Sequence, residues 1–342
     1  MSASGTSPEK RATFRSFLYR QLFVTPLLPT DVDLEGKTAI VTGSNTGIGF
    51  ECARQLLDLH VSKLIIAVRN ESKGEGSKAR LISDRRVEPS IIEVWKLDME
   101  SYDSISTFVE RAKALDRLDI AVLNAGVMNQ KHHITAITGH EQTIQVNVLS
   151  TALLSIQLLP LLKPRSPSEP PGRLVAVSSD MASWAKFREK DSTPLLPALD
   201  RLESFDVPER YSLSKLLGQL FVSELAKHVP PSAVLITMPN PGLCYGTGLG
   251  VAPGGNIVDS VAGLLKRVFG RSPSVGARTL TDAAVHHGVE AHGQYLEDCK
   301  IQPQAPLLYQ PGAHALRQSF WAEIMSELAF SHAEQIVKEF EV

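Results

Sequence analysis

The chain has 342 residues, which is long enough for one large α/β domain or two smaller ones. Hydrophobic residues make up 43% of it and charged residues 21%, the ordinary composition of a soluble globular protein. The 35 lysines and arginines nearly balance the 37 aspartates and glutamates, so the formal net charge of −2 offers no basic surface for a nucleic-acid partner.

The residues before position 34 form an N-terminal extension. A polar leader, MSASGTSPEK, precedes RATFRSFLYRQLFV, in which Phe14, Phe17, Leu18 and Leu22 recur at helical spacing. This pattern predicts a short helix that packs on its own domain or on a second subunit. Peripheral contact with a membrane surface is the alternative, because arginines lie among the apolar residues. A mitochondrial address fits less well, since Glu9 is acidic.

Short apolar runs alternate with helical patterns along the middle of the chain. Strands are predicted at 37–41, 63–68, 91–97, 119–124, 173–179 and 233–238, and helices at 48–59, 72–83, 101–115, 141–159 and 211–228. Such alternation is typical of a parallel sheet with helices on both faces. We therefore predict one Rossmann-type, doubly wound α/β domain over 34–300. A helical tail over 301–342 follows, with an amphipathic helix at 318–330 as a dimer or lid element.

No transmembrane segment, disulfide or metal site is expected. The apolar run over 151–162 is too short for a span and contains Pro160, so it predicts a buried helix. Cys52, Cys244 and Cys299 form no CxxC pair, which indicates a reducing compartment, the cytoplasm. The histidines at 132–133 and 286–287 are adjacent pairs, whose side chains point to different sides of a helix or strand and rarely chelate together.

A glycine cluster follows the first predicted strand. In VTGSNTGIG, Gly43, Gly47 and Gly49 have a G-x-x-x-G-x-G spacing at the start of the first helix. Glycines allow a tight turn and a close backbone approach, and the helix N-terminus offers free N–H groups to a pyrophosphate. An ordinary turn is the alternative for an isolated cluster, but this position favours dinucleotide binding.

The end of the second strand bears on the choice of dinucleotide. Twenty positions after Gly49 lies Arg69, where an acidic residue would accept hydrogen bonds from the adenosine ribose. A guanidinium can instead pair with a 2′-phosphate, so we predict NADP(H), with Lys73 as a helper. A solvated surface arginine is the alternative.

The segment YSLSK places Tyr211 and Lys215 four residues apart, on the same face of a predicted helix. A packing tyrosine beside a solvated lysine would show the same spacing. Alternatively, the ammonium group lowers the pKa of the phenol from about 10 toward neutrality, so that the phenol can exchange a proton.

Seven motifs in this order resemble the short-chain dehydrogenases/reductases, especially their retinol-dehydrogenase-type and fungal biosynthetic members. They are TGSNTGIG (42–49), LDME (97–100), LNAG (123–126), VNVLS (146–150), VAVSS (175–179), YSLSK (211–215) and NPGLC (240–244). The resemblance extends from about Leu34 to about Leu296.

The resemblance implies a catalytic tetrad of Asn147, Ser179, Tyr211 and Lys215, with Ser179 preferred to Ser178. Tyr211 would be the general acid/base, Ser179 would bind the substrate oxygen, and Lys215 would hold the nicotinamide ribose. Asn147 would anchor a water that connects Lys215 to solvent. The implied cofactor-binding residues are Gly43, Asn45, Thr46, Gly47, Ile48, Gly49, Arg69, Asp98, Asn124, Ala125, Gly126, Tyr211, Lys215, Pro241 and Gly242. Asp98 would contact the adenine, and Asn124 would line the cofactor cleft.

Two segments depart from the family pattern. The gap from Ser179 to Tyr211 is unusually long, and its insert at 182–210 is expected to cap the substrate cleft, with the loop at 243–275 as the other wall. Thr247 lies one place later than the threonine that the family places near the nicotinamide, so we assign it no cofactor role. The expected wall residues are Leu195, Leu196, Leu199, Phe205, Leu243 and Leu249, which favour an apolar, bulky substrate.

The predicted function is NADP(H)-dependent interconversion of an alcohol and a carbonyl on a secondary-metabolite or lipid-like small molecule, by a homodimer. The first alternative is a non-catalytic dinucleotide-sensing regulator of the same fold, which would tend to lose the tyrosine–lysine pair. The second is an epimerase or dehydratase, which usually carries a larger C-terminal domain than the one here.

Overall fold

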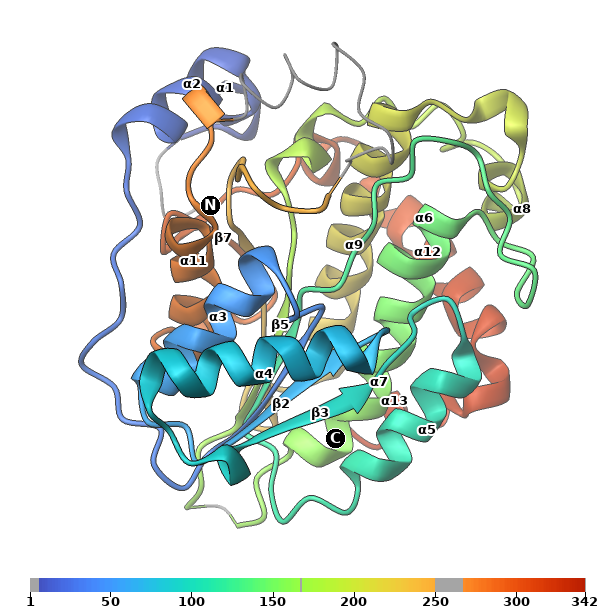
Figure 1. Ribbon diagram of the computed structural model, residues 1–342. Coiled ribbons are helices and arrows are strands. Elements are labelled where there is room, and N and C mark those ends of the chain that lie inside the picture. Colours follow the sequence, from blue (N-terminus) through green and yellow to red (C-terminus); the bar gives the residue numbers. More distant parts are fainter. Residues whose placement is uncertain (1–5, 167, 250–266, 342) are drawn as a thin grey trace.

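The structure is a computed structural model that describes residues 6–166, 168–249 and 267–341. Its centre is an eight-stranded sheet of order β3-β2-β1-β4-β5-β6-β7-β8 (Figure 1). The strands are β1 (Thr38–Thr42), β2 (Lys63–Val68), β3 (Ile92–Lys96), β4 (Ile120–Leu123), β5 (Gly172–Ala176), β6 (Val234–Asn240), β7 (Gln294–Glu297) and β8 (Lys300–Gln302). All neighbours pair in parallel except β7 and β8. The predicted doubly wound, Rossmann-type fold is confirmed.

Side chains alternate across the sheet and form a separate core on each face. In β2, Leu64 and Ile66 belong to one core and Ile65 and Ala67 to the other. The helices of the first face are α3 (Gly47–Asp58), α4 (Glu71–Arg85) and α11 (Pro273–Val285). Those of the second are α5 (Tyr102–Ala112), α7 (Thr151–Leu162), α9 (Val207–His228), α12 (Ala313–Glu327) and α13 (Ala333–Lys338). The order of the strands reverses between β1 and β4, which places the ligand crevice at their carboxyl ends.

The long central helix is irregular in the middle. It begins as α6 (Gln142–Ile144), widens to a π-helical stretch over Gln145–Ser150 and continues as α7. Stretches of π-helix are rare in proteins, and those that occur are often at functional sites. Asn147 of the predicted tetrad lies in this stretch. By length and composition alone, Gln142–Leu162 could cross a membrane, but most of it is buried inside the protein. The prediction of a buried helix is confirmed.

Apart from Trp184 at its start, the 182–210 insert packs into the core rather than over a cleft. Its helix α8 (Leu195–Leu199) buries Leu195, Leu196 and Leu199, and the backbone N–H groups of the first two donate to the Glu323 carboxylate of α12 at 2.8–2.9 Å. Phe205 lies edge-on against the ring of His132. The expectation that these four apolar residues line the substrate cleft is wrong, because the neighbouring helix α12 takes up the apolar face of the insert.

A partly buried carboxylate, that of Asp200, fixes this insert. Asp200 accepts hydrogen bonds from Nδ1 of His140 at 2.9 Å and from the backbone N–H of Glu141 at 2.8 Å. The other ring nitrogen of His140 lies 3.3 Å from Glu327 of α12. Burial alone would lower the pKa of His140, but the two carboxylates outweigh burial and raise this pKa to about 9. His140 is therefore charged at neutral pH and joins the insert to the C-terminal helices.

The C-terminal tail is part of the same domain. Helix α12 packs on α9 and α13 packs on α7, with Phe320, Ile324 and Met325 buried in the second core. The amphipathic face that predicted a dimer or lid element therefore packs against the protein's own helices.

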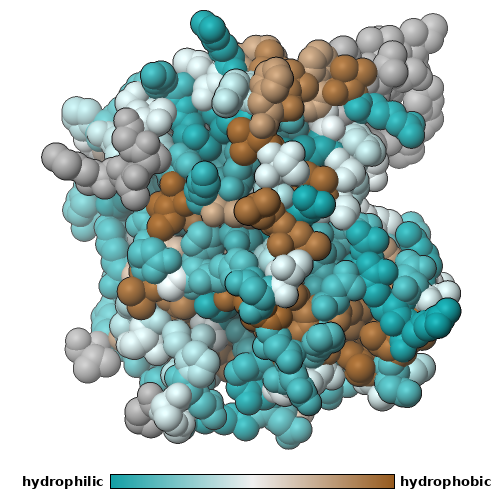
Figure 2. All heavy atoms as spheres, turned by 90° about the vertical axis from the view of Figure 1, so that its left-hand side faces the viewer, coloured by the Kyte–Doolittle hydropathy of each residue, from teal (hydrophilic) through white to brown (hydrophobic). Residues whose placement is uncertain are grey.

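The N-terminal extension forms two short helices, α1 (Pro8–Ala12) and α2 (Phe14–Phe23), at the top of Figure 1. Thr13 separates them, because its hydroxyl accepts a hydrogen bond from the N–H of Ser16 at 3.2 Å and caps α2. The predicted helix packed on its own domain is confirmed. Its outer side stays apolar, with Phe23 and Leu27 exposed, and Figure 2 shows apolar side chains gathered at the top of the same flank.

Candidate active site

A cavity of about 690 Å³ lies at the carboxyl ends of the central strands. This size is within the range of ligand sites. Every predicted cofactor-binding residue except Gly49 lines it, as do Ser179, Tyr211 and Lys215 of the predicted tetrad. Leu243 and Leu249 line it too, as expected, and so does Thr247, to which we assigned no cofactor role. One surface therefore joins the glycine loop to the tyrosine–lysine pair.

The glycine loop has a backbone that only glycine adopts easily. Gly43 and Gly47 have φ values of +63° and +61°, in the left-handed region. Asn124 holds the loop from the end of β4: its Nδ2 donates to the carbonyl oxygen of Thr42 at 3.0 Å and to that of Gly43 at 3.3 Å. Asn124 thus shapes the loop in addition to lining the cavity. The loop leads directly into the N-terminus of α3, where free N–H groups can bind a pyrophosphate.

Gly49 lies behind the loop and sets its shape. A β-carbon there would lie 2.5 Å from Nδ2 of Asn124 and 2.6 Å from the carbonyl oxygen of Gly43. Since backbone must move to relieve this overlap, we expect Gly49→Ala to weaken NADPH binding by about tenfold or more, the equivalent of about 1.4 kcal/mol or more. Titration of NADPH fluorescence measures the change.

The control for this variant is Gly76→Ala, in the exposed middle of α4. A β-carbon at Gly76 would meet no atom within 4 Å in the part of the chain that the structure describes. We expect unchanged NADPH affinity and equal or slightly higher thermal stability, because alanine favours helix. Wild-type affinity in Gly49→Ala would contradict the assignment of this loop to the cofactor.

Two charged side chains meet at the edge of the cavity. Arg69 directly follows β2, and its Nη1 lies 2.5 Å from Oε1 of Glu100. Its side chain is 66% exposed, so most of the guanidinium remains free to bind a ligand. Asp98 follows β3, and its carboxylate accepts the N–H of Glu100 at 3.1 Å. Lys73, in the first turn of α4, lines the same edge.

Tyr211 projects from α9 into the cavity and is almost buried. Burial raises the pKa of its phenol above the usual value, and the nearby charge of Asp180 raises it further. The hydrogen bond with Ser179 acts in the opposite direction. The pKa of the phenol is therefore raised in the protein alone, and its acidification by Lys215 together with the oxidised nicotinamide stays a prediction for the cofactor complex.

Lys215 lies one turn further along α9. Its ammonium is 5.7 Å from the centre of the Tyr211 ring and donates to the carbonyl oxygen of Val177 at 2.9 Å. Burial lowers its pKa from 10.5 to about 8. The lysine therefore still carries its charge at neutral pH, and it lies beside the phenol as the spacing predicted.

The two serines after β5 have different partners. Ser178 is buried, and its hydroxyl accepts a hydrogen bond from Nε2 of Gln219 at 3.1 Å. Ser179 caps the short 3₁₀ helix η3 (Asp180–Trp184), with Oγ accepting from the N–H of Met181 at 3.2 Å. Both serines line the cavity, but only Ser179 lowers the pKa of the Tyr211 phenol, and this influence favours Ser179 as the catalytic serine.

Asn147 lies behind the cavity and does not line it. Its side-chain amide accepts the N–H of Val127 and donates to the carbonyl oxygen of the same residue, both at 2.8 Å. It also donates to Oγ of Ser214 at 3.0 Å, and that hydroxyl donates to the carbonyl oxygen of Tyr211 at 2.7 Å. The side chain thus positions α9. The water that Asn147 was expected to anchor stays a prediction.

The structure adds cavity residues that sequence reasoning missed. Asp180, directly after Ser179 in VSSD, lines the cavity near Tyr211 with one carboxylate oxygen buried, and burial followed by the charge of Glu297 raises its pKa to about 7. Phe14, Phe17 and Trp184 form an aromatic part of the wall. The helical spacing of the phenylalanines was visible in the sequence, but the surface they cover was not.

Comparisons with known proteins identify the family of this chain. The family described as short chain dehydrogenase matches residues 37–188. The short-chain dehydrogenase fogG of Aspergillus ruber is 49% identical over 97% of this chain and 97% of its own length. The short chain dehydrogenase/reductase mfmJ of Annulohypoxylon moriforme is 40% identical over 91% and 90% of the two chains. The short chain dehydrogenase virL of Hypocrea virens is 38% identical over 96% and 95%.

Solved structures share the fold. An uncharacterised protein from Mycobacterium paratuberculosis aligns with a TM-score of 0.63 at 22% identity, over 89% of this chain and 98% of its own. A short chain dehydrogenase from Shigella flexneri, complexed with NADP, aligns with a TM-score of 0.53 at 17% identity, over 79% and 98%. With fungal relatives that match along almost the whole length, the chain belongs to the short-chain dehydrogenase/reductase family and is an oxidoreductase.

Proposed function

We propose that the protein uses NADP(H) to interconvert an alcohol and a carbonyl on an apolar small molecule, with Tyr211 as the general acid/base. One observation carries the proposal: the phenol of Tyr211, the ammonium of Lys215 and the hydroxyl of Ser179 all face the cavity that begins at the glycine loop. The glycine loop fits a cofactor, because Gly43 and Gly47 line the cavity without side chains and a β-carbon at Gly49 would overlap the loop backbone behind them.

The chain's own residues handle the proton. Ser179 would donate a hydrogen bond to the substrate oxygen, and Tyr211 would transfer its phenolic proton to that oxygen during reduction, or accept it during oxidation. Lys215 would hold the ribose and stabilise the phenolate that remains. The bound nicotinamide supplies or accepts the hydride.

The phenol of Tyr211 carries its proton at neutral pH in the protein alone, because burial raises its pKa above the usual value of about 10. This is the form that donates a proton to a carbonyl oxygen during reduction. In oxidation, the positive nicotinamide ring would favour the phenolate.

The proposed preference for NADP(H) rests on Arg69 and Lys73 at the cavity edge. A guanidinium pairs with a 2′-phosphate through charge-assisted hydrogen bonds, worth about 1.5–3 kcal/mol. We expect Arg69→Asp to lower the ratio of kcat/KM with NADPH to kcat/KM with NADH by at least about tenfold. Initial rates with both cofactors measure this ratio.

A matched exchange, Arg85→Asp, controls for the charge change. Arg85 lies at the far end of α4 and pairs with Asp58, away from the cavity. We expect it to leave the cofactor ratio unchanged. An unchanged ratio in Arg69→Asp would show that Arg69 is a surface arginine paired with Glu100 only.

The proposed function is tested by following NADPH oxidation by absorbance, with a panel of apolar aldehydes and ketones. We expect turnover with at least one class of carbonyl and none without substrate. Cofactor binding without turnover of this panel, and of the corresponding alcohols with NADP⁺, would instead support the dinucleotide-sensing alternative.

A further inference from the structure

We propose that the N-terminal helix α2, held in place by α1, is a wall of the substrate site, and that Phe14, Phe17 and Trp184 select a substrate that carries an aromatic ring. The proposal rests on the proposed function, because it identifies the substrate class of the same cavity. Both phenylalanines line that cavity together with Tyr211, although the chain between them and Tyr211 is almost two hundred residues long. The extension is therefore part of the active-site surface.

The three rings form one cluster with a free surface. Phe17 stacks on Phe14 with ring centres 5.8 Å apart, and it meets Trp184 edge to face at 5.3 Å. Phe17 is only 8% exposed, whereas Phe14 is 64% exposed and Trp184 is 36% exposed. The indole Nε1 donates to the carbonyl oxygen of Ala12 at 2.7 Å, which fixes Trp184 to the helix pair. The outer rings therefore keep aromatic faces that a flat ligand can cover.

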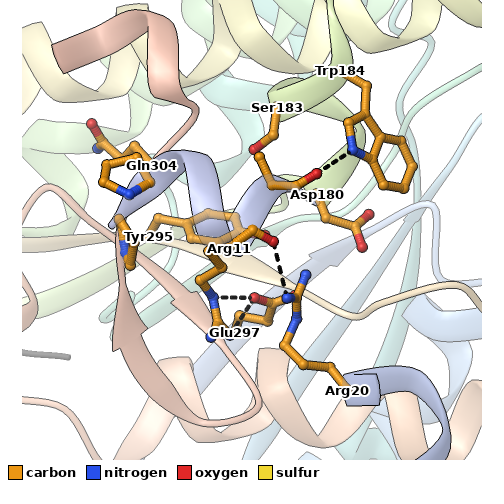
Figure 3. Close-up of a pocket in the computed structure, with 11 residues that line it drawn as sticks. Arg11, Arg20, Asp180, Ser183, Trp184, Tyr295, Glu297 and Gln304 are labelled. Atoms are coloured by element: carbon orange, nitrogen blue, oxygen red, sulfur yellow. Dashed lines mark hydrogen bonds and ion pairs between the residues drawn. The ribbon is translucent and has the colours of Figure 1, made fainter. Parts of the chain in front are cut away.

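A buried ion cluster holds the helix pair in this place. Figure 3 shows Arg11 and Arg20 on either side of Glu297, at the end of β7. Nε of Arg11 donates to Oε2 at 2.8 Å, and Nε of Arg20 donates to Oε1 at 2.9 Å. Arg20 and Glu297 are buried, so breaking their ion pair would leave a buried charge without a partner, which destabilises the fold. Nη1 of Arg20 also donates to the carbonyl oxygen of Arg11, which joins the two helices.

The helix pair also holds the loop on the cofactor side. The amide of Gln21 accepts the N–H of Leu243 at 3.1 Å and donates to the carbonyl oxygen of the same residue at 2.9 Å. Arg271 donates to the carbonyl oxygens of Arg20 and Val24 at 3.0 and 2.9 Å. A β-carbon at Gly242 would lie 2.5 Å from Oε1 of Gln21, so this close contact depends on glycine. Through these contacts α2 is attached to a loop that lines the same cavity.

The test is equilibrium binding, which does not depend on turnover. Two methyl ketones of equal carbon number, 2-acetonaphthone and 2-dodecanone, are titrated into the full chain with saturating NADP⁺ present, by calorimetry. Phe17→Leu keeps an apolar side chain and removes the ring. We expect it to weaken binding of the aromatic ketone by about fivefold or more, and binding of the aliphatic ketone by less than about twofold.

The matched control is Tyr19→Leu, on the exposed outer side of α2, which should leave both affinities unchanged. Phe14→Leu is the second variant, because its exposed ring can be removed without risk to folding; we expect the same selective loss.

Unchanged affinity for 2-acetonaphthone in both phenylalanine variants would overturn the proposal. Equal loss for the two ketones, or no binding of the aromatic ketone to the wild type, would overturn the aromatic substrate class. If turnover fails but selective binding holds, the proposed function is wrong and this wall stands.

Discussion

Replacing Tyr211 by phenylalanine lowers kcat for carbonyl reduction by at least about 100-fold, because a positioned acid/base contributes about 10²–10⁴ in rate. The ring is almost buried, and phenylalanine fills the same space, so the fold and the cavity are kept. Only the hydroxyl that Ser179 contacts is removed. NADPH affinity should therefore stay within about twofold of the wild type, since this hydroxyl is not part of the glycine loop.

The measurement combines steady-state rates with NADPH fluorescence titration, so that a loss of chemistry is distinguished from a loss of cofactor. Tyr102→Phe is the matched control. Tyr102 is a partly buried tyrosine on α5, and its hydroxyl contacts Glu327 at 3.3 Å, among the C-terminal helices. We expect its turnover to equal that of the wild type. Turnover by Tyr211→Phe at the wild-type rate would remove Tyr211 from the mechanism.

The sequence predicted those strands of the fold that are continuous apolar runs. Strands β1 to β6 and the helices between them follow the predicted alternation to within a few residues. The hairpin of β7 and β8 was missed, because QYLE and KIQ are short and partly polar. Its two-residue turn has positive φ at Asp298 and Cys299, where a hairpin turn normally signals itself by Asn-Gly or Asp-Gly.

The insert shows where pattern reasoning fails. The leucines of α8 were correctly recognised as apolar, but an apolar side chain is equally suited to a core and to a substrate wall. Only the position of α12, about 120 residues later in the chain, decides between the two. The same limit applies in reverse to Phe17, whose helical spacing predicted packing on the domain but not which surface it packs against.

The candidate site was predictable by position but not by electrostatics. The motifs identified three residues that face one cavity, Ser179, Tyr211 and Lys215. They could not reveal that Asp180 lies near the phenol with one carboxylate oxygen buried, since its charge acts through space and depends on Glu297 and Arg20 from distant segments. Burial also cannot be read from a spacing of four residues, and burial decides the direction of the pKa shift at Tyr211.

Replacing Lys215 by methionine should abolish function and yet stabilise the fold. We expect kcat/KM to fall by at least about 100-fold, because the cation beside the phenol is lost. A lysine whose pKa is lowered from 10.5 to about 8 destabilises the folded protein while it is charged. One pKa unit corresponds to about 1.4 kcal/mol, and the cavity is open to solvent, so we expect a gain of about 1–3 kcal/mol at pH 7. Water can replace the ammonium at the carbonyl oxygen of Val177.

The pH dependence of the free energy of unfolding distinguishes this charge effect from a change in packing, which would not depend on pH. Between pH 8 and 10.5 the unfolded wild type binds more protons at Lys215 than the folded one, so its free energy of unfolding rises with pH in this window. The methionine variant should lack that rise, and its advantage over the wild type should shrink toward pH 10.5. Urea unfolding at several pH values measures both.

Lys227→Met, at the exposed end of the same helix, is the control and should change neither turnover nor this pH profile. A variant less stable than the wild type at pH 7, with the rise from pH 8 to 10.5 intact, would show that the buried ammonium does not carry the strain we assign to it.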